Sequence, residues 1–204
     1  MPPSRRQDLI DTALSLFMAQ GYHATGIDRI LKESGVSRMT LYNHFKSKDE
    51  LILATLQHRH ETLEQDLDST LADCDCDPIE RLLAVFDYHT AWLTSPEFHG
   101  CAFVNAAAEF PSQSCEIRGL IARHKRSVVA RLCREATAAG LDQPESLAQR
   151  LNLILEGAIA AAMSTDSPCG SDPEALSAAD AASHAKAAAE ILIERAFEAP
   201  AARL

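Results

Sequence analysis

The sequence predicts an all-α protein of about nine helices. Nine prolines and eight glycines among 204 residues are few for an all-β chain with many tight turns, and alanine, the strongest helix former, is abundant. Apolar residues recur at helical spacing along most of the chain, and no β alternation of useful length interrupts them. With 47% hydrophobic and 24% charged residues, the composition is that of a globular protein, long enough for one or two compact units.

Three sequence features bear on where the protein works. The longest unbroken apolar run, Ala158 to Met163, is far shorter than a membrane span. The start, Met1 to Asp8, is polar and basic and lacks the apolar core of a secretory signal. The six cysteines are scattered and do not read as a disulfide framework, so reduced thiols are expected. Together these features favour the cytoplasm.

The first two helices are defined by an apolar stripe and by turn residues. Leu9 to Phe17 places one apolar stripe on a helix, and Gly21 follows at a C-cap distance. Thr25 offers an N-cap oxygen to a short second helix over residues 26–34. Gly35 then breaks this helix.

Serines mark the starts of the next two helices. Ser37 is placed to cap a third short helix over residues 38–45, and Ser47 to cap a fourth, long helix that continues to the acidic break at residues 73–77. Asp49 and Glu50 suit the N-terminus of that helix. Further helices are predicted over residues 78–94, 101–110, 111–140, from Pro144 to about Met163, and 173–197.

The two short helices on either side of Gly35 have the spacing of a helix-turn-helix, a motif that projects its second helix into a DNA groove. A plain helical hairpin is the alternative. Residues 1–50 carry a net charge of +1 although the whole chain carries −10, so an acidic body follows a nearly neutral head. We therefore expect a three-helix DNA-binding domain at 1–50 and a separate helical domain at 51–204.

The run from Gly21 to Leu51, GYHATGIDRILKESGVSRMTLYNHFKSKDEL, resembles the TetR family of transcriptional repressors. The shared signature is Gly-Tyr before the first turn, Gly-Val-Ser at the second, and Leu-Tyr-x-His-Phe-x-x-Lys-x-x-Leu after it. Leu31 and Met39 depart from the family pattern, which has small residues there. The operator sequence is therefore not carried over with the resemblance.

The resemblance implies phosphate contacts from four side chains, those of Thr25, Tyr42, His44 and Lys48. Residues 37–40, at the start of the third helix, should face base edges. Hydroxyls, free amides at a helix start and a lysine are good phosphate ligands, and Arg38 has the geometry to bind guanine bidentately. For Tyr42 the alternative is a core aromatic, and for Lys48 a solvated charge. The predicted DNA-binding residues are Thr25, Gly26, Ser37, Arg38, Met39, Thr40, Tyr42, His44 and Lys48.

For residues 51–204, the resemblance implies a ligand-sensing and dimerisation domain. It implies a homodimer formed by the last two helices, which suits a palindromic site. Two stripes of small and apolar residues support that interface, although an ordinary internal core is the alternative for each. The stripes are Leu151, Ile154, Ala158 and Ala162, and Ala185, Ala189, Leu192 and Ala196.

The stretch between residues 86 and 110 is rich in aromatic residues and is predicted to line an apolar pocket with a few polar anchors. A small apolar effector is expected there, and no cofactor. The candidate ligand-binding residues are Phe86, His89, Trp92, Phe103, Asn105 and Glu109.

Cysteine chemistry gives an alternative sensor. Cys101 follows Gly100 at a predicted helix start, where a thiolate is stabilised, and residues 100–109 resemble the corresponding stretch of oxidant- and electrophile-sensing repressors of the same family. A buried structural cysteine is the other interpretation. Cys74 and Cys76 lack the spacing and the second pair of a zinc site, so no metal is predicted.

Two other classes of protein fit the sequence less well. A helical enzyme is disfavoured because no G-x-S-x-G, H-E-x-x-H, C-x-x-C or glycine-rich phosphate loop is present. An interaction module without DNA binding leaves the arrangement of Ser37, Tyr42 and Lys48 unexplained. The sequence thus predicts a ligand-responsive, DNA-binding transcriptional repressor that is not an enzyme.

Overall fold

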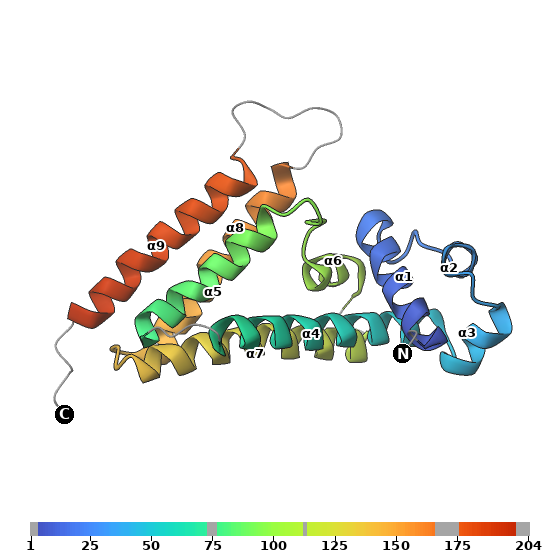
Figure 1. Cartoon of the computed structure of the whole chain (residues 1–204), viewed down its shortest axis with the longest axis horizontal. Helices are drawn as coiled ribbons and strands as arrows, with labels where there is room; N and C mark the ends of the chain where they lie inside the picture. Colours follow the sequence, from blue (N-terminus) through green and yellow to red (C-terminus); the bar gives the residue numbers. More distant parts are fainter. Residues whose placement is uncertain (1–3, 73–76, 112–113, 166–175, 199–204) are drawn as a thin grey trace. The chain divides into compact units, whose positions relative to one another are not determined.

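The computed structural model describes residues 4–72, 77–111, 114–165 and 176–198, and within these ranges the chain forms nine α-helices and no strand (Figure 1). The predicted all-α class is confirmed. No helix in these ranges is long and apolar enough to cross a membrane. The helices are α1 (Arg5–Gln20), α2 (Ile27–Ser34), α3 (Arg38–His44), α4 (Lys48–Ala72), α5 (Pro78–Leu93), α6 (Ala102–Glu109), α7 (Cys115–Ala138), α8 (Pro144–Thr165) and α9 (Ala178–Glu198).

Predicted capping residues fix several of the helix boundaries. Gly21 ends α1 at φ 89°, and its N–H donates to the carbonyl oxygen of Phe17. The Ser37 hydroxyl accepts the N–H of Thr40 at 3.1 Å and so caps α3, while the Ser47 hydroxyl accepts the N–H of Glu50. These bonds satisfy N–H groups that the first turn of a helix leaves without partners.

The predicted cap of α2 is wrong. Gly26 occupies the N-cap position, and Thr25 precedes it. Thr25 is completely buried, and its hydroxyl donates to the carbonyl oxygens of Leu16 and Gly21. Its side chain therefore ties the turn back to α1 and leaves the start of α2 uncapped.

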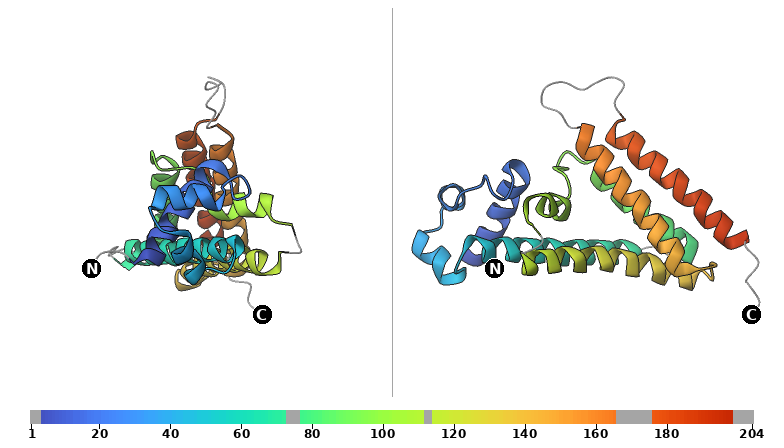
Figure 2. Two further views of the ribbon diagram at one scale, coloured as in Figure 1. Left: turned by 90° about the vertical axis from the view of Figure 1, so that its right-hand side faces the viewer. Right: turned by 180° about the vertical axis from the view of Figure 1, so that it is seen from behind.

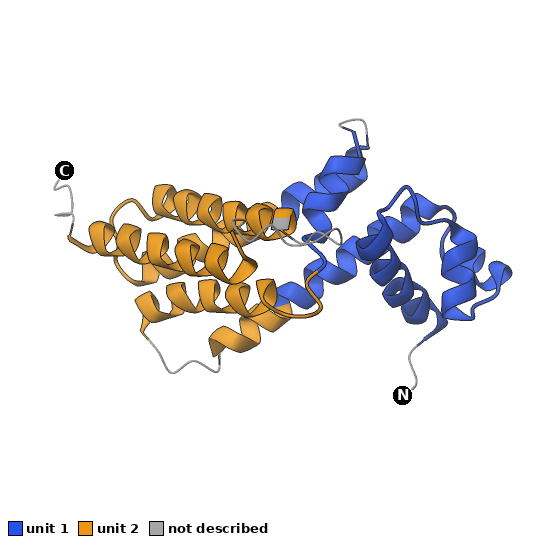
Figure 3. Cartoon of the chain, turned by 90° about the horizontal axis from the view of Figure 1, so that it is seen from above, with its two compact units in different colours: residues 1–64, 99–124 blue, residues 65–98, 125–204 orange. Residues whose placement is uncertain are grey.

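The chain divides into two compact units, one of residues 1–64 and 99–124 and the other of residues 65–98 and 125–204 (Figure 3). The first unit thus combines α1, α2, α3 and α6 with parts of α4 and α7. The division into residues 1–50 and 51–204 expected from the sequence is one of function, and it stays a prediction.

In the first unit, α1 packs against α2 and α3. Apolar side chains on the inner faces of the three helices set the angle between them, as expected for a helix-turn-helix. The fully or almost fully buried members are Leu9, Ala13, Phe17, Ile30, Leu41 and Phe45.

In the second unit, α8 runs alongside α9, and α5 packs against both, as the views in Figures 1 and 2 agree. Leu151 and Ala189 are completely buried in the core of this unit, and Ala158, Ala162 and Ala185 are also buried. These five side chains are therefore not available to a dimer surface, whereas Ile154, Leu192 and Ala196 of the same stripes are half-buried. A dimer interface on α8 and α9 stays a prediction. Within one chain α8 packs against α9, and small side chains let two helices approach closely.

Candidate nucleic-acid interface and effector site

The turn between α2 and α3 is built by Gly35, whose left-handed backbone (φ 65°, ψ 14°) ends α2. Val36 and Leu41 anchor the following segment in the core, with 5% and 0% of their surfaces exposed. The opposite face of α3 is exposed and carries Met39 and Tyr42, of which 75% and 46% are accessible. Tyr42 is therefore not a core aromatic.

The predicted base-reading residues lie together at the start of α3. Ser37, Arg38 and Met39 are exposed, and Thr40 is half-buried with its hydroxyl 2.8 Å from that of Ser37. The Arg38 guanidinium pairs with the carboxylate of Asp28 on α2. Both side chains are exposed, and exposed pairs of this kind contribute little free energy. Arg38 is thus available to exchange this carboxylate for another hydrogen-bond acceptor.

Lys48, at the start of α4, reaches back to the turn that follows α1. Its Nζ donates to the carbonyl oxygen of His23 at 3.2 Å. Partial burial lowers the pKa of Lys48, while the neighbouring carboxylates of Glu109 and Asp49 act in the opposite direction. Lys48 is therefore a positioned cation rather than a freely solvated one.

The remaining predicted DNA-binding residues differ in accessibility. His44 and Gly26 are exposed, and no atom lies within 4 Å of the position a Cβ at Gly26 would take. The hydroxyl of Thr25, by contrast, is buried and already donates within the protein, so it is not accessible to a phosphate.

The predicted ligand-binding residues fall into two groups, one in each unit. Phe86, His89 and Trp92 lie on α5 in the second unit, while Phe103, Asn105 and Glu109 lie on α6 in the first. Phe86 belongs to the hydrophobic core, and Phe103 is fully buried with its ring stacked on His124 at 3.7 Å between centroids.

His89 and Trp92 are half-buried neighbours on α5. Their rings stand edge to face at 6.3 Å, and Trp92 makes a similar contact with Phe98 at 5.0 Å. Nδ1 of His89 lies 2.7 Å from the carbonyl oxygen of Val85 and must carry a proton, because a carbonyl only accepts. Burial lowers the pKa of His89, which favours the neutral ring and leaves Nε2 as an acceptor.

Glu109 contacts the DNA-reading end of the first unit. Its Oε1 accepts the backbone N–H of Tyr22 at 2.8 Å, and its Oε2 accepts that of His23 at 2.7 Å. The sequence predicted Glu109 as a ligand anchor and did not reveal this contact. No sequence signal was available for it, because the partners are more than eighty residues apart in the chain and the bonds are to backbone groups.

Cys101 is the N-cap residue of α6 and is 5% exposed. Burial raises the pKa of Tyr22 well above the usual range of a phenol, and Cys101 and Glu109 add to this shift. Cys74, Cys76 and Cys169 lie outside the described residues. Across the described ranges, His, Cys, Asp and Glu side chains form no group that could hold a metal ion.

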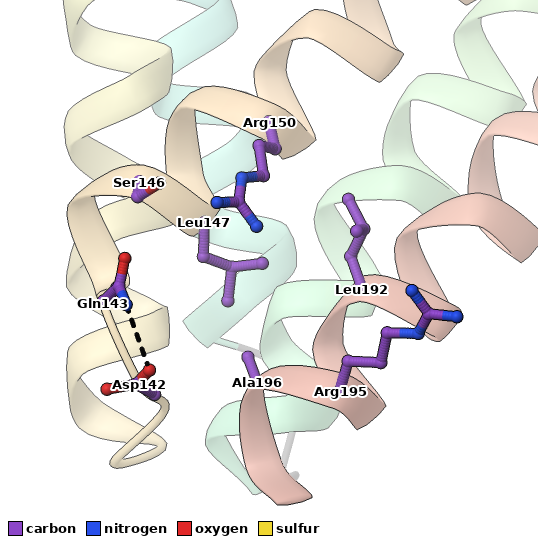
Figure 4. Close-up of a pocket in the computed structure, with 8 residues that line it drawn as sticks. All are labelled: Asp142, Gln143, Ser146, Leu147, Arg150, Leu192, Arg195 and Ala196. Atoms are coloured by element: carbon purple, nitrogen blue, oxygen red, sulfur yellow. Dashed lines mark hydrogen bonds between the residues drawn. The ribbon is translucent and has the colours of Figure 1, made fainter. Parts of the chain in front are cut away.

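A pocket of about 200 Å³ that the sequence did not predict lies between the start of α8 and the end of α9 (Figure 4). Leu147, Leu192 and Ala196 form its apolar part. Arg150 and Arg195 also line it and form no ion pair within the part of the chain that the structure describes. The other lining residues are Asp142, Gln143 and Ser146.

A three-helix unit with an exposed, glycine-preceded α3 defines the class of helix-turn-helix DNA-binding proteins. Residues 9–55 match the family described as bacterial regulatory proteins, tetR family, and residues 78–173 match the tetracyclin repressor-like C-terminal domain. The chain belongs to the tetR family of transcriptional regulators, which are not enzymes.

Individual relatives agree with this assignment. The HTH-type transcriptional regulator BetI of Brucella suis is 31% identical over 169 residues, which are 78% of this chain and 76% of that protein. The HTH-type transcriptional activator FasR of Mycolicibacterium smegmatis is 48% identical over 59 residues, but these cover only 29% of this chain and 27% of FasR. The crystal structure of SCO4454, a TetR-family regulator from Streptomyces coelicolor, has 27% identity and a TM-score of 0.85, covering 97% and 92% of the two chains.

Proposed function

We propose that the protein binds a palindromic operator as a homodimer, represses transcription there, and is released from DNA by a small effector. The observation that carries DNA reading is the exposed face of α3, where Arg38, Met39 and Tyr42 project from a helix whose other face is buried. The choice of repression over activation rests on the family resemblance alone. The relatives do not decide it, because FasR is named an activator.

Dimerisation is supported by large apolar side chains that α8 and α9 leave uncovered. Leu153 is 70% exposed, Ile191 is 53% exposed and Phe197 is 67% exposed. Several exposed apolar side chains on two adjacent helices are a feature of protein interfaces. A two-fold dimer would place two recognition helices in successive major grooves, about 34–36 Å apart.

Effector binding is assigned to α5 in the second unit, where His89 and Trp92 are the accessible members of the predicted set. Because His89 Nε2 is an acceptor, the effector should be an apolar molecule that offers a hydroxyl or N–H donor.

A second candidate trigger is chemical modification of Cys101. The observation in its favour is that Cys101 precedes Ala102, whose carbonyl oxygen accepts a hydrogen bond from the Tyr22 hydroxyl. A bulky adduct on the thiol would disturb this bond between α6 and the DNA-reading end. DNA release by hypochlorite or an aldehyde should then be lost in Cys101→Ser, and identical release from both proteins would exclude this trigger.

The proposed DNA binding is tested by a mobility-shift assay on the DNA upstream of the protein's own gene over a series of salt concentrations. Binding should weaken steeply with salt, since a nearly neutral head must gain affinity from local phosphate contacts. Scrambled DNA of equal length is the control. Equal affinity for both DNAs at every salt concentration would contradict sequence-specific binding.

A further inference from the structure

The short helix α6 is bound at both ends to a single residue of the DNA-reading end, Tyr22. At its N-terminus, the carbonyl oxygen of Ala102 accepts the Tyr22 hydroxyl at 3.0 Å. At its C-terminus, Glu109 accepts the Tyr22 backbone N–H at 2.8 Å. Tyr22 itself is completely buried and stacks on Phe17 of α1 with 5.0 Å between ring centroids. A displacement of α6 therefore cannot leave Tyr22 unaffected.

The position of Glu109 in its own helix argues for a role outside that helix. A carboxylate in the last turn is unfavourable to the helix dipole, whose C-terminus is already negative. The cost is offset by two charge-assisted hydrogen bonds to the consecutive amides of Tyr22 and His23. The turn is shaped to admit the carboxylate: Gly21 has φ 89°, and a Cβ there would lie 3.1 Å from Oε1 of Glu109.

The same turn is held from its other side by a proposed DNA contact. The His23 N–H binds Glu109, while the His23 carbonyl oxygen accepts the Nζ of Lys48 at 3.2 Å. The His23 ring packs edge-on against Phe110, the residue after Glu109, at 4.9 Å. The backbone of one residue thus lies between the carboxylate on α6 and the ammonium expected to contact a phosphate.

We propose that Glu109 is the residue through which α6 and operator binding influence each other. The inference rests on the proposed function, and it specifies how release is transmitted. When Lys48 binds a phosphate, its hydrogen bond to the His23 carbonyl holds the turn of residues 21–23 in place. Because Glu109 is bonded to the amides of this turn, α6 is then held in place as well. Because coupling between two sites is reciprocal, an event that moves α6 must weaken the hold of the turn and of Lys48 on DNA.

The test is amide hydrogen exchange of the full-length protein with and without the DNA upstream of its gene, for wild type and for Glu109→Ala. In wild type, DNA should slow exchange several-fold in α3, in residues 21–23 and in α6. In Glu109→Ala, the slowing should persist in α3 and be lost in α6. Glu116→Ala, an exposed carboxylate in the first turn of α7, is the matched control and should behave as wild type.

Two further results separate a coupling role from a merely structural one. Glu109→Gln keeps the side-chain length and one acceptor oxygen, so its α6 should show partial slowing; this variant also serves if Glu109→Ala does not fold. Equal slowing of α6 in wild type and both variants would overturn the proposal. The proposal would also be overturned if the wild-type protein shifts the DNA in a gel but shows no change of amide exchange in α6. That result would leave the proposed DNA binding intact. A wild-type protein that does not bind this DNA would contradict both proposals.

Discussion

The hydroxyl of Tyr22 donates a hydrogen bond to the carbonyl oxygen of Ala102 across 80 residues of chain. Both groups are buried, and burial raises the pKa of Tyr22, with smaller contributions from Cys101 and Glu109. The phenol therefore stays protonated and remains a donor at any physiological pH. This bond joins α6 to the segment that precedes the recognition helices.

Tyr22→Phe should lower the free energy of unfolding by about 1–3 kcal/mol, because the Ala102 carbonyl would be left buried without its donor. Urea denaturation followed by circular dichroism measures this change. Tyr42→Phe removes an exposed hydroxyl and is the control, for which no comparable loss is expected. Equal stability of wild type and Tyr22→Phe would mean that water replaces the donor.

Arg38→Ala should relax base preference by about 1–3 kcal/mol at one position per half-site, the usual discrimination from a bidentate guanine contact. The measurement is a competition assay with operators that carry single base substitutions. Arg29→Ala removes another exposed, ion-paired arginine, on α2, and should leave the preference unchanged. A uniform loss of affinity over all substituted operators in Arg38→Ala would identify Arg38 as a phosphate contact instead.

Lys48→Ala should weaken binding to all DNA sequences to a similar extent. Each lost phosphate contact reduces the slope of log K against log salt by about 1, so a dimer should lose about 2. Affinities measured by fluorescence anisotropy at several salt concentrations give this slope. A variant with an unchanged slope would show that Lys48 only braces the His23 turn.

Ile191→Arg should raise the dimer dissociation constant at least about tenfold, since it would place an unpaired charge in a desolvated contact. Light scattering over a dilution series measures the monomer fraction, and Leu153→Glu provides the same test on α8. Ala189→Glu is the contrasting variant, because Ala189 is completely buried within one chain and this change should unfold the protein. An undisturbed dimer in both surface variants would place the interface elsewhere.

The lowered pKa of His89 makes stability depend on pH with a defined sign. The unfolded chain, with a histidine pKa of about 6.5, takes up a proton at higher pH than the folded protein does. The contribution of His89 to the free energy of unfolding is thus fully present above about pH 6.5. It is lost as the pH falls from 6.5 toward the pKa of His89 in the folded protein. Urea titrations between about pH 7.5 and 5 should show a smaller loss of stability in His89→Asn, whose amide N–H can still donate to the Val85 carbonyl. Parallel curves for the two proteins would contradict this assignment.

Local sequence features predicted the DNA-reading helices well. The Gly21 and Gly35 breaks and the Ser37 cap act through backbone groups a few residues away, so spacing along the chain is enough to predict them. Thr25 was misassigned because a threonine hydroxyl at this position can either accept a helix N–H as a cap or donate to a nearby carbonyl. In the structure it donates to the backbone carbonyls of Leu16 and Gly21.

Contacts between distant segments were beyond the reach of sequence patterns. The stripes containing Ala158 and Ala189 predicted close helix packing, but a stripe does not say whether the partner helix belongs to the same chain or to another. The Glu109 bonds to Tyr22 and His23 involve backbone amides, which every residue except proline offers, so no residue type marked them in advance. The exposure of Leu153 and Ile191 was equally unpredictable, since an apolar residue in a helix is expected to be buried.

The Glu109 carboxylate binds main-chain amides and so makes no demand on which side chains the DNA-reading helices carry. A DNA-binding domain with a different recognition helix, and hence a different operator, keeps the hydrogen bonds to Glu109 as long as its backbone turns in the same way after α1. Exchange of residues 27–46 between members of the family should therefore yield chimaeras that bind a new DNA sequence and are still released from it by the original effector. The substitutions to avoid are those at Gly21, where any side chain would meet the carboxylate.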